Sequence, residues 1–190
     1  ISIQGHLSNG SIVQDDLYYE SIKEITIAAQ SAMDAFLYDH PEVFWMRSLR
    51  YANAIVKRVT GEDSFEGEVT KVSLMPQEIY TGAYDLMDVF DEAFADTITQ
   101  LSLEIRDTEN RALVVKKIHD YLCENMYYDY KSPAISHSVI PAFMGDGGLV
   151  CEGYAKSFKI LCNAFHVPCA CIGGVAHPDT DSAEGHMWNY

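Results

Sequence analysis

Residues 148–155 read GLVCEGYA and residues 185–189 read GHMWN, and these two stretches decide how the fold is interpreted. The first places Cys151 after a glycine-rich turn, at the start of a pattern with helical spacing. The second places His186 in a short strand-like run. Thiol-based acyl transfer needs this pair, because a thiolate attacks the carbonyl carbon and an imidazole takes and returns the proton. We therefore predict a Cys151–His186 site that joins a helix to a strand.

The sequence after Cys151 predicts a helix that buries one face and that Pro168 ends. The apolar positions with helical spacing are Tyr154, Phe158, Leu161, Cys162 and Phe165. A thiol at a helix N-terminus lies near free N–H groups and the positive end of the macrodipole, which favour the thiolate and could also stabilise an oxyanion. We expect Glu152 to complement the dipole in the first turn and Gly153 to allow close packing or substrate approach.

An apolar strand is expected over residues 169–176 and a second strand over residues 185–190, joined by a polar loop. The loop contains Asp179 and Asp181, which would have to fold back to reach His186.

Alternation along the second strand determines which side chains lie on the same face. His186 and Trp188 should share one face, while Met187 and Asn189 should share the other. Asn189 is therefore poorly placed to orient His186, although asparagine does this in some cysteine proteases. Trp188 is expected to form a packing wall beside the site and to take no part in the chemistry.

Three ordered blocks of sequence carry a further indication. They are VCEGYA at 150–155, GHMWN at 185–189, and IHDYL at 118–122 with YYDY at 127–130. With these blocks, roughly residues 108–190 resemble the bacterial transglutaminase-like superfamily, a branch of the papain-like cysteine enzymes. The resemblance implies that Cys151 is the nucleophile and His186 the general base and acid. It also implies a third triad member, an aspartate on the next strand; none is evident within residues 1–190, so we expect it after residue 190 or replaced.

Composition excludes several classes of partner. The 190 residues carry a net charge of −15, which argues against nucleic acid and anionic membrane surfaces. No apolar run approaches the ~20 residues of a membrane span, so membrane insertion is not expected. The sequence starts at Ile1 with no visible signal peptide, so we expect an extracellular or cell-surface protein whose signal has been removed, with a cytoplasmic location as the alternative. No cofactor is expected, and the sequence does not determine the oligomeric state.

The five cysteines of the chain are interpreted as free thiols, because their number is odd, their spacing is irregular and most lie in apolar runs. Cys123 and Cys162 are expected in the core, and His119 is expected to be structural. Four residues could supply zinc ligands: His166, Cys169, Cys171 and His177. No Cys-x-x-Cys knuckle appears, so we predict that no metal is bound tightly and that residues 169–171 lie in a strand packed on the nucleophile helix.

The predicted fold class is α+β: a transglutaminase-like core, with the nucleophile helix packed on a small antiparallel sheet, follows a helical N-terminal region with a β-hairpin. Its two parts are residues 1–107 and 108–190. The elements expected in the first part are a helix over 15–37, a strand over 43–46, a hairpin of 50–59 with 65–74, and a helix over 80–105. Thr108 is expected to cap a helix over 109–126.

These observations favour thiol-dependent acyl transfer or hydrolysis at amide bonds of a protein or peptide substrate. The alternative is a non-catalytic transglutaminase-like module that binds peptide, cell-wall or carbohydrate ligands. An imidazole without an orienting partner can rotate and take the wrong tautomer. We therefore expect little amide turnover from the 190-residue chain and recovery of activity in a chain extended through the next strand.

Overall fold

The fold is that of a computed structural model. It describes residues 2–46, 50–75, 84–145, 147–176 and 184–190. The chain divides into two compact units, which consist of Ile1–Phe36 with Trp45–Glu78 and of Leu37–Phe44 with Ile79–Tyr190. Among the helices in the described ranges, none combines the length and apolarity that a membrane span requires.

The first unit contains an antiparallel sheet with the strand order β2-β1-β4-β3. Its strands are β1 (Ser2–Ser8), β2 (Ser11–Ile12), β3 (Arg50–Val59) and β4 (Ser64–Met75). The predicted hairpin of β3 and β4 is confirmed. β1 and β2 were not predicted, although Asn9 and Gly10 between them both have positive φ angles, of 51° and 75°. An Asn-Gly pair of this kind is a strong hairpin signal.

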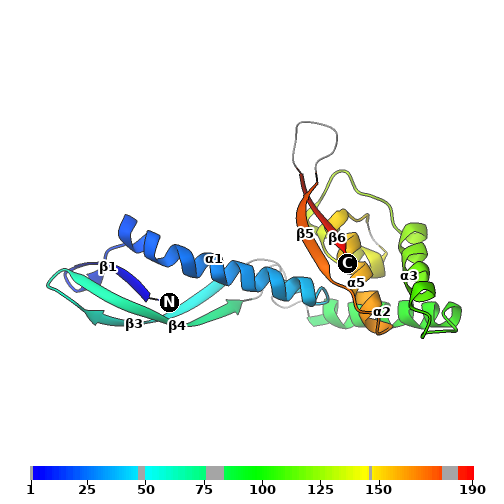
Figure 1. Cartoon of the computed structure of the whole chain (residues 1–190), viewed down its shortest axis with the longest axis horizontal. Coiled ribbons are helices and arrows are strands. Elements are labelled where there is room, and N and C mark those ends of the chain that lie inside the picture. The colour runs from blue at the N-terminus through cyan, green and yellow to red at the C-terminus, as the bar shows by residue number, and fades with distance from the viewer. Residues whose placement is uncertain (1, 47–49, 76–83, 146, 177–183) are drawn as a thin grey trace. The chain divides into compact units, whose positions relative to one another are not determined.

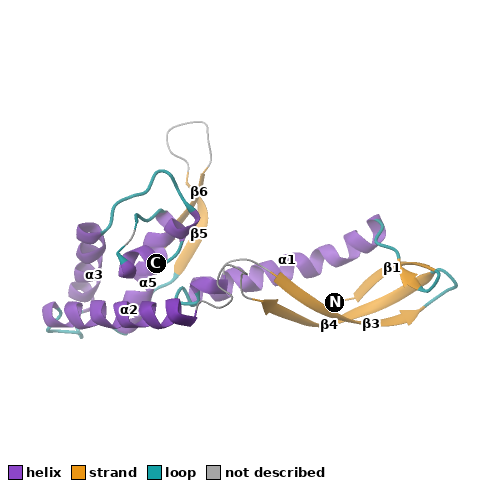
Figure 2. Ribbon diagram, turned by 180° about the vertical axis from the view of Figure 1, so that it is seen from behind, coloured by secondary structure: helices purple, strands orange, loops and turns teal. Residues whose placement is uncertain are grey.

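Helix α1 (Asp16–Asp39) lies along one face of this sheet, as both views show (Figure 1, Figure 2). Alternate residues of β1 point toward the helix side, so Ile3 and Leu7 join Ile25 of α1 and Phe65 of β4 in one buried cluster. Gly5 lies between them because a Cβ there would meet the Phe65 ring at 2.7 Å. The predicted helix over 15–37 is confirmed.

The second unit is mainly helical. Its helices are α2 (Tyr84–Glu104), α3 (Arg111–Asn125), the 3-10 helix η3 (Ala134–His137), α4 (Ile140–Met144) and α5 (Cys151–Ala164). The boundary predicted at residue 107 lies inside this unit, between α2 and α3. Residues 80–83 of the predicted helix over 80–105 lie outside the described residues.

Three local predictions need correction. The strand expected over 43–46 is wrong, because Phe44–Met46 form a 3-10 helix whose Phe44 ring packs at 4.9 Å on Phe90 of α2. A four-residue apolar run does not distinguish a strand from a helical turn. The cap of α3 is Asn110, whose side chain accepts from Leu113 N at 3.2 Å, and not Thr108.

The third correction concerns the end of α5, which comes before Pro168. The helix ends at Ala164, and His166 takes a left-handed φ of 57°. Val167 N then donates to Cys162 O at 2.9 Å, and His166 N donates to Asn163 O at 3.1 Å. This pair of bonds is a Schellman motif, which completes the helix end without the proline.

The strands β5 (Cys171–Ala176) and β6 (Glu184–Asn189) form an antiparallel pair that packs on α5 (Figure 1). Ala155 of α5, Cys171 of β5 and Met187 of β6 form the buried contact, with Tyr38 beside them. The α+β class and the predicted packing of the helix that begins at Cys151 on a small antiparallel sheet are therefore confirmed.

Candidate active site

Cys151 is the first residue of α5, and its side chain is half-buried. The preceding residue, Val150, is extended (φ −96°, ψ 178°), and its side chain provides no cap for the first turn. The first N–H groups of a helix have no intrahelical partners. The thiol therefore lies where free backbone donors gather, as the sequence predicted.

A distant segment fixes the backbone just before α5. Leu149 N donates to Tyr127 O at 3.0 Å, and Asp129 N donates to Leu149 O at 3.0 Å, so Tyr128 and Leu149 form a parallel bridge. Gly148 permits this approach, because a Cβ there would lie 2.6 Å from the Tyr127 ring. The position of Cys151 is thus set by residues 127–129 as well as by its own helix.

Gly153 serves close packing against the same side of the fold. A Cβ at this position would lie 2.3 Å from Ser136 O, which is a backbone atom that cannot move aside easily. The same carbonyl accepts a hydrogen bond from Val150 N at 3.1 Å. Gly153 therefore lets η3 contact the first turn of α5 directly.

His186 lies on the exposed face of β6, opposite Gly174 of β5. Its ring stacks on that of Trp188, with the centroids 6.2 Å apart and an interplanar angle of 25°. The Trp188 ring crosses Gly174, where a Cβ would lie 2.6 Å from it. Trp188 therefore forms a wall beside the imidazole.

Cys151 and His186 both line two neighbouring cavities. The first, of about 320 Å³, is largely apolar and aromatic; its other lining residues include Tyr128, Tyr154, Phe158 and Trp188. The second, of about 410 Å³, is bordered by His137, Glu152, Gly174 and Gly185 among others. The structure thus brings the predicted thiol and imidazole to one place, with space for a ligand on either side.

Asn189 faces α5, as the strand alternation predicted. Its Nδ2 donates to Ala155 O at 2.9 Å. Within the described ranges, nothing forms a hydrogen bond with the His186 ring, and Asp179 and Asp181 lie outside those ranges. The third triad member stays unassigned.

Sequence analysis missed a polar network behind Cys151 that centres on Glu152. Its Oε1 accepts from Lys156 Nζ, and its Oε2 accepts from His137 Nδ1 at 2.8 Å. The other ring nitrogen of His137 forms a hydrogen bond with Ser132 Oγ at 2.9 Å. Burial alone would raise the pKa of Glu152, but the charge of Lys156 and the hydrogen bonds from Lys156 and His137 outweigh it and hold this pKa below its usual value. Spacing could have indicated the Glu152–Lys156 pair, which is i,i+4 on a helix.

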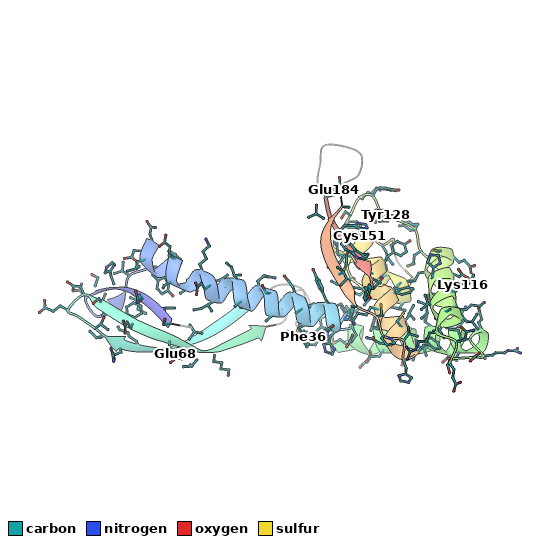
Figure 3. The ribbon with its side chains drawn as sticks, viewed as in Figure 1. Phe36, Glu68, Lys116, Tyr128, Cys151 and Glu184 are labelled. Carbon is teal, nitrogen blue, oxygen red and sulfur yellow. The ribbon has the colours of Figure 1, made fainter. Side chains whose placement is uncertain are left out.

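Tyr128 is the other side chain at the site that the sequence did not single out. It lines the apolar cavity together with Cys151, and burial is the main cause that raises the pKa of its hydroxyl above the usual value. Figure 3 shows these two labelled side chains at the same end of the second unit. The resemblance included Tyr128 in a matching block, but nothing in the residue pattern indicated that it would line the same cavity as Cys151.

The comparison with known families agrees with this geometry. Residues 99–190 match the model of the transglutaminase-like superfamily. This part of the chain belongs to that superfamily. The match begins within α2 and includes both Cys151 and His186. The superfamily is generally one of cysteine-dependent acyl transfer and peptidase activity. No curated protein matches the chain.

A second thiol of the transglutaminase-like domain opens into the apolar cavity. Cys123 was expected in the core, but it is exposed. The buried face of α3 carries Val114, Ile118 and Leu122, and the residue after Leu122 points about 100° away from it. His119, also exposed, lies with Nε2 3.6 Å from Cys123 Sγ, and both residues line the cavity.

The remaining three cysteines lie in the last turns of α5 and around the start of β5. Cys162 is fully buried, as predicted, and shares a hydrogen bond with Cys169 that lowers the pKa of Cys169 to about 7 and raises that of Cys162. Burial raises the pKa of Cys171 to about 11. Cys171 begins β5, whereas Cys169 lies just before it.

Zinc ligation by these residues has no support in the geometry. His166 is exposed, and His177 lies outside the described residues. Across the described ranges, no three His, Cys, Asp or Glu side chains gather in a metal-binding arrangement. The absence of a tightly bound metal stays a prediction.

Proposed function

We propose that the transglutaminase-like domain catalyses thiol-dependent acyl transfer or hydrolysis at amide bonds of peptides or proteins. The observation that carries the proposal is the meeting of Cys151 and His186 at the same two cavities, with Cys151 at the first residue of α5. Nucleophilic catalysis requires a thiol and a base within reach of one bound carbonyl.

The roles follow from the chemistry of the two groups. The Cys151 thiolate adds to the carboxamide carbon, and the carbonyl π electrons move to oxygen. When the carbonyl re-forms, the C–N bond breaks and the imidazolium of His186 gives its proton to the leaving amine. The resulting thioester passes its acyl group to water, which gives an acid, or to an amine, which gives a new amide.

The surroundings of the thiol are suited to a peptide substrate. The apolar cavity offers Tyr154, Phe158 and Trp188 to an uncharged side chain, while the second cavity is bordered by Glu152 and His137. A site with different chemistry on its two sides can hold a substrate in one orientation.

The direct test is acylation of the protein by p-nitrophenyl acetate, followed by release of p-nitrophenolate and by the mass of the modified protein. This leaving group departs without a proton, so the assay does not depend on the group that orients His186. Cys151→Ser should abolish the rapid release of p-nitrophenolate. Cys123→Ser is the matched control, because Cys123 is exposed at the same cavity and should leave the release intact.

Two outcomes would count against catalysis. Equal release by wild type and Cys151→Ser would show that the cysteine is not the nucleophile. Absence of any acylation, together with saturable binding of a glutamine-containing peptide by both proteins, would favour the non-catalytic binding module.

A further inference from the structure

A serine, a histidine and a glutamate form a row of hydrogen bonds that joins the segment around η3 to the first turn of α5. Ser132 Oγ lies 2.9 Å from His137 Nε2, and His137 Nδ1 lies 2.8 Å from Glu152 Oε2. A hydroxyl within hydrogen-bond reach of a base, which a third group orients, is the arrangement that nucleophilic catalysis uses. The row contains neither Cys151 nor His186, so it is a second constellation of nucleophile, base and carboxylate.

The carboxylate of Glu152 decides which nitrogen of His137 carries the proton. Burial alone would raise the pKa of Glu152, but Lys156 and His137 hold it below its usual value, so the group is ionised at neutral pH. An ionised carboxylate only accepts hydrogen bonds, so Nδ1 of His137 must donate to it. In the neutral ring, Nε2 then has no proton and accepts from the Ser132 hydroxyl. This is the tautomer in which an imidazole can take the proton of a serine.

The backbone at Ser132 is held in an unusual conformation. Its φ angle is 48°, in the left-handed region that residues with a side chain seldom occupy. The turn is closed by two bonds to Asp129, because Ser132 N donates to Asp129 O and Lys131 N donates to Asp129 Oδ1, each at 3.0 Å. Asp129 N in turn donates to Leu149 O, just before α5. Residues held in such conformations cluster at functional sites, which makes Ser132 a candidate for one.

The three side chains differ in their access to solvent. Ser132 is exposed, whereas the side chains of His137 and Glu152 are only 29% and 28% exposed. A reagent can therefore reach the hydroxyl, while the base and the carboxylate are partly shielded, which strengthens the bond between them. Ser102 of α2 provides the contrast, because it is also exposed but donates to Ile98 O of its own helix at 2.7 Å.

We propose that Ser132 is a second nucleophile of this domain, which His137 activates and Glu152 orients, and that it accepts acyl groups from carboxylic esters. His137 Nε2 takes the hydroxyl proton as Ser132 Oγ bonds to the carbonyl carbon and the π electrons move to oxygen. When the carbonyl re-forms, the bond from carbon to the alcohol oxygen breaks, and the imidazolium gives its proton to that oxygen. The products are an acyl-serine and an alcohol, and His137 ends the step neutral.

Esters fit this site better than amides do. The backbone N–H of Ser132 is already bound to Asp129 O, so it is not free to stabilise an oxyanion. The hydroxyl must therefore attack a carbonyl whose leaving group departs readily, and an alcohol leaves more readily than an amine. The inference does not rest on the function proposed above, because no step uses Cys151.

The test is labelling of the full chain by a fluorophosphonate, whose phosphorus reacts with activated serine hydroxyls and releases fluoride. Peptide mapping should find the adduct at Ser132, and Ser132→Ala should lose it. His137→Asn keeps an N–H that can donate to Glu152 and removes the base at Nε2, so labelling should be about 100-fold slower. Ser102→Ala is the matched control, because Ser102 is an exposed serine without an imidazole partner, and it should label as wild type does.

A second measurement uses an ester. The Cys151→Ser chain should release p-nitrophenolate slowly from p-nitrophenyl acetate, and this slow release should disappear in Cys151→Ser/Ser132→Ala. Release that stays unchanged in the double variant would contradict the acyl-acceptor role of Ser132.

Three labelling results would overturn the inference. One is a wild-type map without an adduct at Ser132, which needs no variant and so decides the question even if His137→Asn fails to fold. Another is equal labelling of Ser102 and Ser132. The third is unchanged labelling in a His137→Asn chain whose urea unfolding, followed by Trp188 fluorescence, matches wild type. Failure of acylation at Cys151 would be a separate result, because the fluorophosphonate reports Ser132 alone.

Discussion

Replacing Glu152 by glutamine should destabilise the second unit far more than loss of an exposed charge would. Lys156 is only 8% exposed as a residue, and its ammonium group is paired with Glu152. Removing one partner from a buried ion pair leaves a buried charge without compensation, at a cost of about 3–5 kcal/mol. The side chain of Glu152 is 28% exposed, so we take the lower end, about 3 kcal/mol. The hydrogen bond from His137 Nδ1 to the carboxylate is weakened in the same variant.

The measurement is urea unfolding at neutral pH, in a Trp45→Phe background that leaves Trp188 as the only indole. Trp188 lies in the second unit, so its fluorescence reports that unit alone. With a urea dependence of about 2 kcal/mol per M, a loss of about 3 kcal/mol lowers the unfolding midpoint by about 1.5 M. The control is Asp120→Asn, which breaks another i,i+4 lysine–carboxylate pair at a site where Lys116 is exposed. It should change the unfolding midpoint little.

A pH series separates the charge of Glu152 from its packing. The folded-state pKa of Glu152 lies below the usual value, so its carboxylate stabilises the fold fully above that usual value. This contribution is lost as the pH falls through the folded-state pKa. The difference in stability between wild type and Glu152→Gln should therefore be constant near neutral pH and shrink below about pH 4.

The reasoning would be refuted by either of two results. One is a decrease in the free energy of unfolding of Glu152→Gln that is no larger than the decrease in Asp120→Asn. The other is additivity in the double variant Glu152→Gln/Lys156→Met, since removing both partners should relieve the uncompensated charge and restore part of the lost stability.

Further predictions concern the other features of the site. Limiting iodoacetamide at neutral pH, followed by peptide mapping, should label Cys151 first; Cys169, with its pKa of about 7, is the competing thiol, and its preferential labelling would contradict this. Gly153→Ala should lower the free energy of unfolding in urea by about 1–3 kcal/mol, because its Cβ would overlap Ser136 O. At an open helical site, the same replacement of glycine by alanine would raise this free energy. Elemental analysis of the purified protein should find far less than stoichiometric zinc; a value near one per chain would overturn our prediction.

Features with a local signal were predictable from the sequence. The start of α5 at Cys151 follows from the glycine-rich turn before it and the apolar spacing after it. Alternation along β6 correctly predicted that Met187 and Asn189 share one face, which the structure packs on α5. It also correctly predicted that His186 and Trp188 share the opposite face, which is exposed. These predictions depend only on neighbouring residues.

Features that depend on contacts between distant segments were not predictable in this way. The exposure of Cys123 is a matter of one position on α3, which apolar spacing does not resolve at the edge of a buried face. The position of Tyr128 depends on a bridge to Leu149, and the bond from His137 to Glu152 depends on where η3 lies. No periodicity within either segment encodes such a pairing.

The segment between α3 and α4 therefore helps to set the geometry of the site together with α5. It contacts the start of α5 at successive positions: by the bridge to Leu149, by the carbonyl of Ser136 against Val150 and Gly153, and by the imidazole of His137 on Glu152. Each contact uses a different chemistry, so no single substitution removes them all. Because Cys151 lies among these contacts, a change in this segment alters the position of the thiol without touching it. Stability and thiol reactivity should thus change together in variants of the segment.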